Sequence, residues 1–196
     1  MKGYIKIRKK AFEILNSKLS KKLYYHGAHH TYDVLHVINQ FIKNEKIDPY
    51  TAKLLRIGTL YHDIGFTISN IEHEKLGCEI VEKYMLEYGF SNRDIKVVKG
   101  LIMATRIPQT PKNYLEKIIC DADLDYLGRD DFYPISDWLF KELQSFSQIT
   151  DVTEWNKIQI KFLEAHQYHT DFSKKNRQPK KENRIEELKQ LVKIAS

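Results

Sequence analysis

The stretch that decides the fold runs from residue 52 to residue 65 and reads AKLLRIGTLYHDIG. Its apolar side chains recur at helical spacing, and it is too apolar for a surface helix. His62 and Asp63 stand side by side at its end, so we expect this polar pair to be at least partly buried. Burying an imidazole beside a carboxylate is costly unless a partner compensates, and a divalent cation is one efficient compensator. The pair alone is weak evidence, because a hydrogen-bonded buried pair is the commoner outcome.

Helical spacing of apolar residues continues over nearly the whole chain. It predicts helices over residues 4–19, 30–44, 49–64, 72–88, 91–104, 111–127, 130–146, 152–168 and near 181–194. Pro49 fits a first helical turn and Ser91 an N-cap. Alternating strand patterns and Asn-Gly hairpin turns do not occur. We therefore predict an all-α protein: one helical bundle of about eight to nine helices over residues 1–171, followed by a basic C-terminal helical appendage over 172–196.

The composition is that of a globular protein, with 42% hydrophobic and 12% aromatic residues among 196. No apolar run approaches the length of a membrane span, and the first ten residues lack a signal-peptide core, so we expect a cytoplasmic protein without a membrane partner. Cys78 and Cys120 lie in apolar helical segments and predict buried free thiols. A thiolate zinc site is excluded because the chain has no CxxC spacing.

The net charge of +6 gathers at the two ends of the chain. Residues 1–22 hold eight Lys and Arg against one Glu, and residues 172–196 hold eight against three. Basic ends are compatible with nucleic-acid contact. We favour ordinary solvated helix faces, because no aromatic residues interleave with the basic ones and no recognition module is present. Nucleic-acid binding is therefore not expected, while packing of the basic tail on a neighbouring copy leaves a homo-oligomer open.

Four clusters of histidine and acidic residues interrupt helices that otherwise face the core. They are residues 24–31, His62-Asp63, His73-Glu74, and residues 121–125. Imidazole nitrogens and carboxylate oxygens together suit Zn²⁺, Mn²⁺, Fe²⁺ or Co²⁺, or Mg²⁺ with fewer histidines. Two His and two Asp leave coordination positions open for water, and phosphoester hydrolysis needs both activated water and charge neutralisation at phosphorus. We therefore expect a divalent metal cofactor of one or two ions.

The order and spacing of these clusters resemble the H…HD…D signature of the HD-domain metal-dependent phosphohydrolase superfamily. The resemblance covers about residues 20–130 and lies in His30-Thr31 with Val34-Leu35, in residues 60–65, and in residues 121–124. It implies an all-α fold with metal ligands on successive core helices. It further implies ligand roles for His30, His62 and Asp63, with Asp63 able to bridge two ions.

Two aspartates compete for the fourth ligand position implied by this resemblance. Asp121 and Asp123 both match the family's aspartate in slightly different registers, and they lie about 200° apart on an ideal helix, so only one should face the site. We favour Asp121, since Leu124 and Leu127 would then continue its helix inward, and keep Asp123 as the alternative.

Other residues around these motifs are candidates for catalysis. His26 with His30 is similar to a stretch of cyclic-nucleotide phosphodiesterases whose earlier histidine protonates the leaving oxygen, although Gly27 stands where that branch has Asn. A plain loop histidine is the equal alternative. His73 and Glu74 resemble a His-Glu that could hold a second metal or the substrate phosphate, or Glu74 simply caps a helix. Arg106 is the first candidate cation for a phosphate, although a solvated role is the commoner one.

These observations predict a metal-dependent phosphohydrolase that cleaves a phosphomonoester or phosphodiester in a small nucleotide-like substrate. A metal-activated water would attack phosphorus, and Asp63 would help to orient it. The alternatives are a cyclic-nucleotide phosphodiesterase-like enzyme, a non-catalytic metal-stabilised regulatory or binding module, and an iron oxygenase in which His73 is an additional ligand. The identity of the substrate cannot be derived from these residues.

Overall fold

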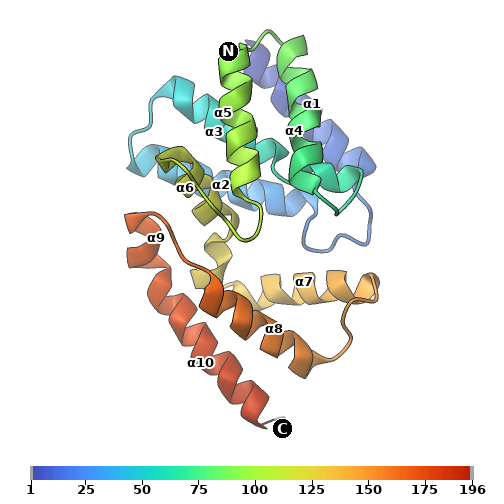
Figure 1. Cartoon of the computed structure of the whole chain (residues 1–196), viewed down its shortest axis with the longest axis vertical. Coiled ribbons are helices and arrows are strands. Elements are labelled where there is room, and N and C mark those ends of the chain that lie inside the picture. Colours follow the sequence, from blue (N-terminus) through green and yellow to red (C-terminus); the bar gives the residue numbers. More distant parts are fainter. Residues whose placement is uncertain (1, 195–196) are drawn as a thin grey trace. The chain divides into compact units, whose positions relative to one another are not determined.

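The computed structural model describes residues 2–194, and its regular secondary structure is entirely helical, without a strand among the described residues. Ten α-helices and two short 3₁₀ segments follow one another (Figure 1). They are α1 Lys2–Lys18, α2 Ala28–Asn44, α3 Pro49–Tyr61, η1 Ile64–Thr67, α4 His73–Glu87, α5 Asn92–Ala104, α6 Tyr114–Asp123, η2 Asp125–Gly128, α7 Phe132–Ser145, α8 Val152–Ala165, α9 Asp171–Asn176 and α10 Gln178–Ile194. The predicted all-α fold is confirmed, and the helix beyond the predicted number is the six-residue α9.

The chain divides into two compact units, each with its own core. Among the described residues, unit 1 contains 2–21 and 26–123, and unit 2 contains 22–25 and 124–194. The boundary that we predicted between residues 171 and 172 therefore falls inside unit 2. The physical reason is that α10, despite its many charges, packs along α8 and η2 and buries Leu188 completely.

Unit 1 is a bundle in which α3 is the central helix. It contacts α1, α2, α4, α5 and α6. Its own fully buried side chains include Ile57, Leu60 and Tyr61, and burying an aliphatic side chain of this size contributes about 1.5–3 kcal/mol. The apolar run quoted first is thus the core helix that its composition predicted.

The caps of α3 fix where its polar end lies. Asp48 accepts hydrogen bonds from the backbone N–H groups of Tyr50 and Thr51, and Pro49 occupies the first turn. At the other end, the Tyr61 hydroxyl donates to the carbonyl of Ile7 at 3.1 Å, which ties this end to α1. The helix ends there, so His62 and Asp63 lie at a buried helix terminus rather than along a face.

Unit 2 is built from α7, α8, α9 and α10 with η2. Its core gathers side chains from these elements and from residue 25, namely Tyr25, Leu124, Tyr126, Leu127, Phe132, Ile135, Leu163 and Leu188. The backbone N–H of Tyr25 donates to the buried carboxylate of Glu142 at 2.8 Å, which fastens residues 22–25 to α7.

Two further expectations concern the cysteines and the membrane. Cys78 and Cys120 are both buried and free, as predicted. Within the described residues we find no helix with both the length and the hydropathy that a bilayer crossing requires.

Candidate metal centre

The candidate metal centre lies in unit 1, at the C-terminal end of α3. His62 follows the last residue of α3 and is completely buried, and Asp63 precedes η1 and is 7% exposed. His62 Nε2 lies 3.2 Å from Asp63 Oδ2. The neighbouring pair predicted to be buried is therefore buried, and both side chains point to the same place.

Two other helices bring ligand atoms to this pair. His30, in the first turn of α2, places Nε2 at 3.3 Å from His62 Nε2 and at 3.5 Å from Asp63 Oδ2. Asp123, the last residue of α6, places Oδ1 at 3.0 Å from His30 Nε2 and at 3.3 Å from His62 Nε2. Donor atoms of three of these residues, His30, His62 and Asp123, all lie within 4.8 Å of one another.

The spacing of these donors fits a first coordination shell. Four ligands arranged tetrahedrally at about 2.0–2.1 Å from a cation are separated from one another by about 3.3–3.4 Å. The separations among His30 Nε2, His62 Nε2 and Asp123 Oδ1 run from 3.0 to 3.3 Å, and Asp63 Oδ2 lies 3.2 and 3.5 Å from the two histidine nitrogens. Donor atoms of His30, His62 and Asp123 thus surround a space of the size that one divalent ion requires, and Asp63 lies beside the two histidines.

The backbone fixes which nitrogen of His62 faces this space. Its Nδ1 lies 2.8 Å from the carbonyl oxygen of Thr59. A carbonyl only accepts hydrogen bonds, so Nδ1 carries a proton and donates, and once Nε2 loses its own proton its lone pair points to the centre. This is the outer hydrogen bond that orients most metal-ligating histidines.

The two carboxylates and the histidines strongly influence one another's ionisation. Burial lowers the pKa of His62, but the charges of Asp63 and Asp123 outweigh it and raise this pKa well above its ordinary value. Burial raises the pKa of Asp123, but hydrogen bonds with His30 and His62 outweigh it and hold this pKa at about 2. The charge of His62 likewise overcomes burial and keeps the pKa of Asp63 well below its usual range. Without a metal, a proton on His62 is favoured by the negative charge of the two carboxylates.

The structure corrects the choice between the two aspartates. Asp123, not the favoured Asp121, lies beside the histidines, whereas Asp121 is fully buried elsewhere on α6. The choice of Asp121 required α6 to continue through Leu124 and Leu127, but the helix ends at Asp123. Because α6 is buried on several sides, an inward-facing apolar stripe does not identify its functional face.

A second set of polar groups lies on the other side of Asp63. His73, the first residue of α4, places Nε2 at 3.4 Å from Asp63 Oδ1 and at 3.5 Å from Glu74 Oε1. Burial lowers the pKa of His73, but its hydrogen bond with Asp63 outweighs this and raises the pKa. Asp63 therefore turns one oxygen to His30 and His62 and the other to His73, which is the arrangement that a bridging carboxylate needs.

His26 lies next to this second set, in the segment that precedes α2. Its ring stacks on Phe66 at 4.2 Å between centroids, and Phe66 stacks on His73 at 4.1 Å. The His26 and His30 rings are 6.2 Å apart. Sequence reasoning missed Phe66, whose only signal is an aromatic residue three positions after Asp63.

Arg106 is not brought to this cluster of histidines and carboxylates. Its guanidinium lies 3.8 Å from Glu72 and is about half exposed. It lines a separate cavity of about 360 Å³ with Lys112 and Glu116.

A comparison with protein families identifies the family of this chain. The model of the HD domain matches residues 27–125, about half of the chain. The chain belongs to the HD-domain family, whose members are generally metal-dependent hydrolases. The matched segment contains His30, His62, Asp63, His73 and Asp123, while His26 lies one residue outside it. Comparisons with curated proteins and with solved structures return no match.

Proposed function

We propose that this protein is a metal-dependent phosphohydrolase acting on a phosphoester of a small nucleotide-like substrate. The observation that carries the proposal is the buried cluster of donor atoms from His30, His62 and Asp123, which lie within 4.8 Å of one another, with Asp63 Oδ2 at 3.2 Å from His62 Nε2. A bound divalent cation would polarise a phosphoryl oxygen and lower the pKa of water toward neutrality. Family membership supports the reaction class and leaves the substrate to be identified.

The protein's own residues supply orientation and proton transfer. Asp63 is held between His62 and His73, so its carboxylate is positioned to accept a hydrogen bond from the attacking water. The partly exposed ring of His26 stacks on Phe66 beside His73, and this supports a role as the acid that protonates the leaving oxygen. A catalytic His26 favours the second candidate function, a cyclic-nucleotide phosphodiesterase-like enzyme.

The direct test is turnover of p-nitrophenyl phosphate, bis-p-nitrophenyl phosphate and a nucleotide panel with Mn²⁺, Mg²⁺, Zn²⁺, Fe²⁺ or Co²⁺. We expect activity that EDTA removes and one of these ions restores. His26→Ala should lower turnover about 100-fold or more, the usual contribution of a general acid. If the protein binds metal stoichiometrically but hydrolyses none of these substrates, the regulatory or binding module is the correct reading. Two irons per chain would instead favour the oxygenase.

Metal binding should release protons, which gives a pH-dependent signature. The two carboxylates raise the pKa of His62, so its ring holds a proton more tightly than a free imidazole does, and a metal ligand must be deprotonated. We therefore expect Mn²⁺ affinity to fall about tenfold for each pH unit below this raised pKa, for one released proton. Calorimetry in buffers of different ionisation enthalpy measures the released protons directly. An affinity that is constant between pH 6 and pH 8 would contradict this assignment.

A further inference from the structure

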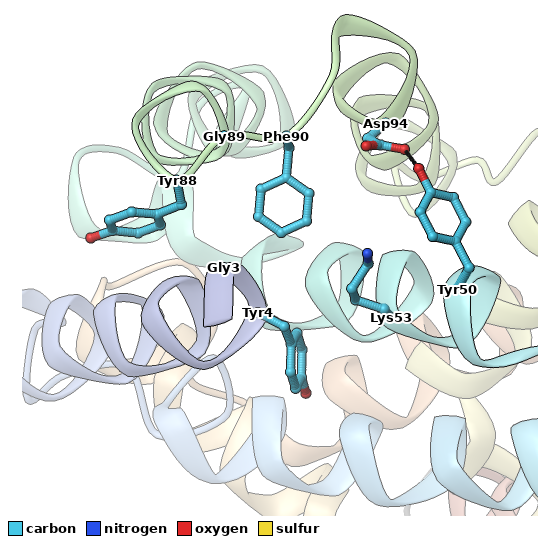
Figure 2. A pocket seen from close by; sticks show the side chains of 8 residues that line it. All are labelled: Gly3, Tyr4, Tyr50, Lys53, Tyr88, Gly89, Phe90 and Asp94. Carbon is cyan, nitrogen blue, oxygen red and sulfur yellow. Dashed lines mark hydrogen bonds between the residues drawn. The ribbon is translucent and has the colours of Figure 1, made fainter. Parts of the chain in front are cut away.

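A second cavity, separate from the candidate metal centre, opens in unit 1 between the start of α1, the start of α3 and the turn from α4 to α5. Its volume is about 280 Å³ (Figure 2). The lining consists of four aromatic residues, two glycines, one lysine and one aspartate, namely Tyr4, Tyr50, Tyr88, Phe90, Gly3, Gly89, Lys53 and Asp94. None of these residues belongs to the candidate metal centre.

The walls of this cavity are held in place by specific contacts. A Cβ on Gly3 would lie 3.0 Å from the carbonyl oxygen of Tyr88 and 3.3 Å from the Phe90 ring, so the glycine lets α1 approach the turn closely. The Tyr50 hydroxyl donates to the buried carboxylate of Asp94 (Figure 2). The other oxygen of Asp94 accepts from the backbone N–H of Ser91 in a capping box. Both oxygens of this carboxylate are therefore engaged within the wall.

The cation that lines the cavity is Lys53, and the carboxylate of Asp94 lies in the same lining. Lys53 Nζ lies 4.3 Å from the centre of the Tyr50 ring and 5.5 Å from that of Phe90, and in Figure 2 it points from α3 toward Phe90. Against burial, hydrogen bonds and the charge of Lys53 lower the pKa of Asp94, but no carboxylate of the described residues lies within ion-pair distance of Lys53. The carboxylate of Asp94 is already engaged by Tyr50 and Ser91, so the ammonium of Lys53 is the charged group left to contact a ligand.

We propose that this cavity binds a small anion that carries a planar aromatic ring, such as a mononucleotide. The ring would stack on Phe90 and the tyrosines, because aromatic faces stack with bases of any identity. The anionic group would be held by the ammonium of Lys53, which has a flexible stem and forms no close ion pair with a carboxylate. The volume lies just below the usual range for ligand pockets, which limits the buried part to about one ring system. The proposal does not depend on the phosphohydrolase function.

Calorimetric titration of the full chain with four probes separates the contribution of ring stacking from that of the anionic group. AMP and benzoate carry both a ring and a negative charge, adenosine carries only the ring, and inorganic phosphate carries only the charge. We expect saturable binding of AMP or benzoate, weaker binding of adenosine, and none of phosphate up to about 1 mM. The stronger of AMP and benzoate identifies the anionic group as phosphate or carboxylate.

Substitutions in the lining of the cavity and in the metal centre test whether the probes bind in this cavity. Lys53→Gln should weaken binding of the anionic probe about tenfold or more and leave adenosine within about twofold, as expected when one charge-assisted hydrogen bond is lost. Phe90→Leu should weaken both. Lys96→Gln, which removes an exposed lysine from α5, is the matched control and should change neither. Binding that persists in Lys53→Gln, or that is lost in His62→Ala, would overturn the proposal, as would the absence of saturable binding.

Discussion

Replacement of Asp123 by alanine is expected to lower Mn²⁺ affinity by more than about a hundredfold and phosphohydrolase turnover by a similar or larger factor. The Asp123 Oδ1 atom lies 3.0 Å from His30 Nε2 and 3.3 Å from His62 Nε2. Loss of an outer hydrogen-bond partner of a metal ligand typically costs 10–100-fold, so loss of a direct ligand should exceed that range. Equilibrium dialysis with measured metal content gives the affinity.

Asp121→Asn is the matched control for this substitution. Asp121 is fully buried on the same helix, two residues earlier, and stands apart from the three residues whose donors cluster. The variant should lose stability and keep metal binding within about tenfold, a change compatible with altered packing alone. Circular dichroism melting establishes that both variants are folded before metal is measured. Loss of metal in Asp121→Asn and its retention in Asp123→Ala would reverse our assignment.

Gly65→Ala is expected to destabilise the protein by roughly 3 kcal/mol or more. A Cβ at this position would lie 1.9 Å from the carbonyl oxygen of His73 and 2.6 Å from its carbonyl carbon. These are backbone atoms, so no side-chain rotation relieves the overlap and the start of α4 must move. Because that movement carries His73 away from Asp63, activity should fall together with stability. Urea denaturation followed by circular dichroism measures the free energy of unfolding.

Gly89→Ala is the control for the loss of a glycine as such. This residue has a φ of 77°, and an added Cβ would meet nothing within 4 Å. Its replacement should cost only about 1 kcal/mol, the price of placing an alanine in the left-handed region. If Gly65→Ala costs no more than Gly89→Ala, the close approach of η1 to α4 is not as described.

Much of the fold and the centre of the site can be predicted from local sequence. The period of apolar residues gives the helices because a helix that packs on others must bury one stripe. The His62-Asp63 pair is recognisable because two polar side chains end an apolar core helix. His30 follows from the resemblance to the HD-domain motif, and the structure brings it within 3.5 Å of both members of the pair.

The fourth ligand could not be chosen in this way. The choice between Asp121 and Asp123 depends on where α6 ends and on which neighbours surround it. Residues 118–122 of that helix are all buried, so the pattern of hydrophobicity does not indicate which face of α6 points to the metal centre. Only the tertiary packing of α6 against α2 decides which carboxylate meets His30.

The stack of His26, Phe66 and His73 likewise depends on tertiary packing. Its three rings come from the segment before α2, from η1 and from α4, and no spacing within one helix relates them. The sequence pattern also did not predict where the C-terminal unit begins. The charges of α10 predicted a peripheral helix, whereas a few buried side chains such as Leu188 are enough to join it to α8.

We infer that one divalent cation is held by His30, His62, Asp63 and Asp123. Diffraction from crystals grown with Mn²⁺, recorded near the manganese absorption edge, tests it most directly. We expect an anomalous peak within about 2.0–2.3 Å of the Nε2 atoms of His30 and His62 and of a carboxylate oxygen of Asp123. A manganese peak at Asp121, or no peak between the two histidines in a protein that binds Mn²⁺ in solution, would contradict the account.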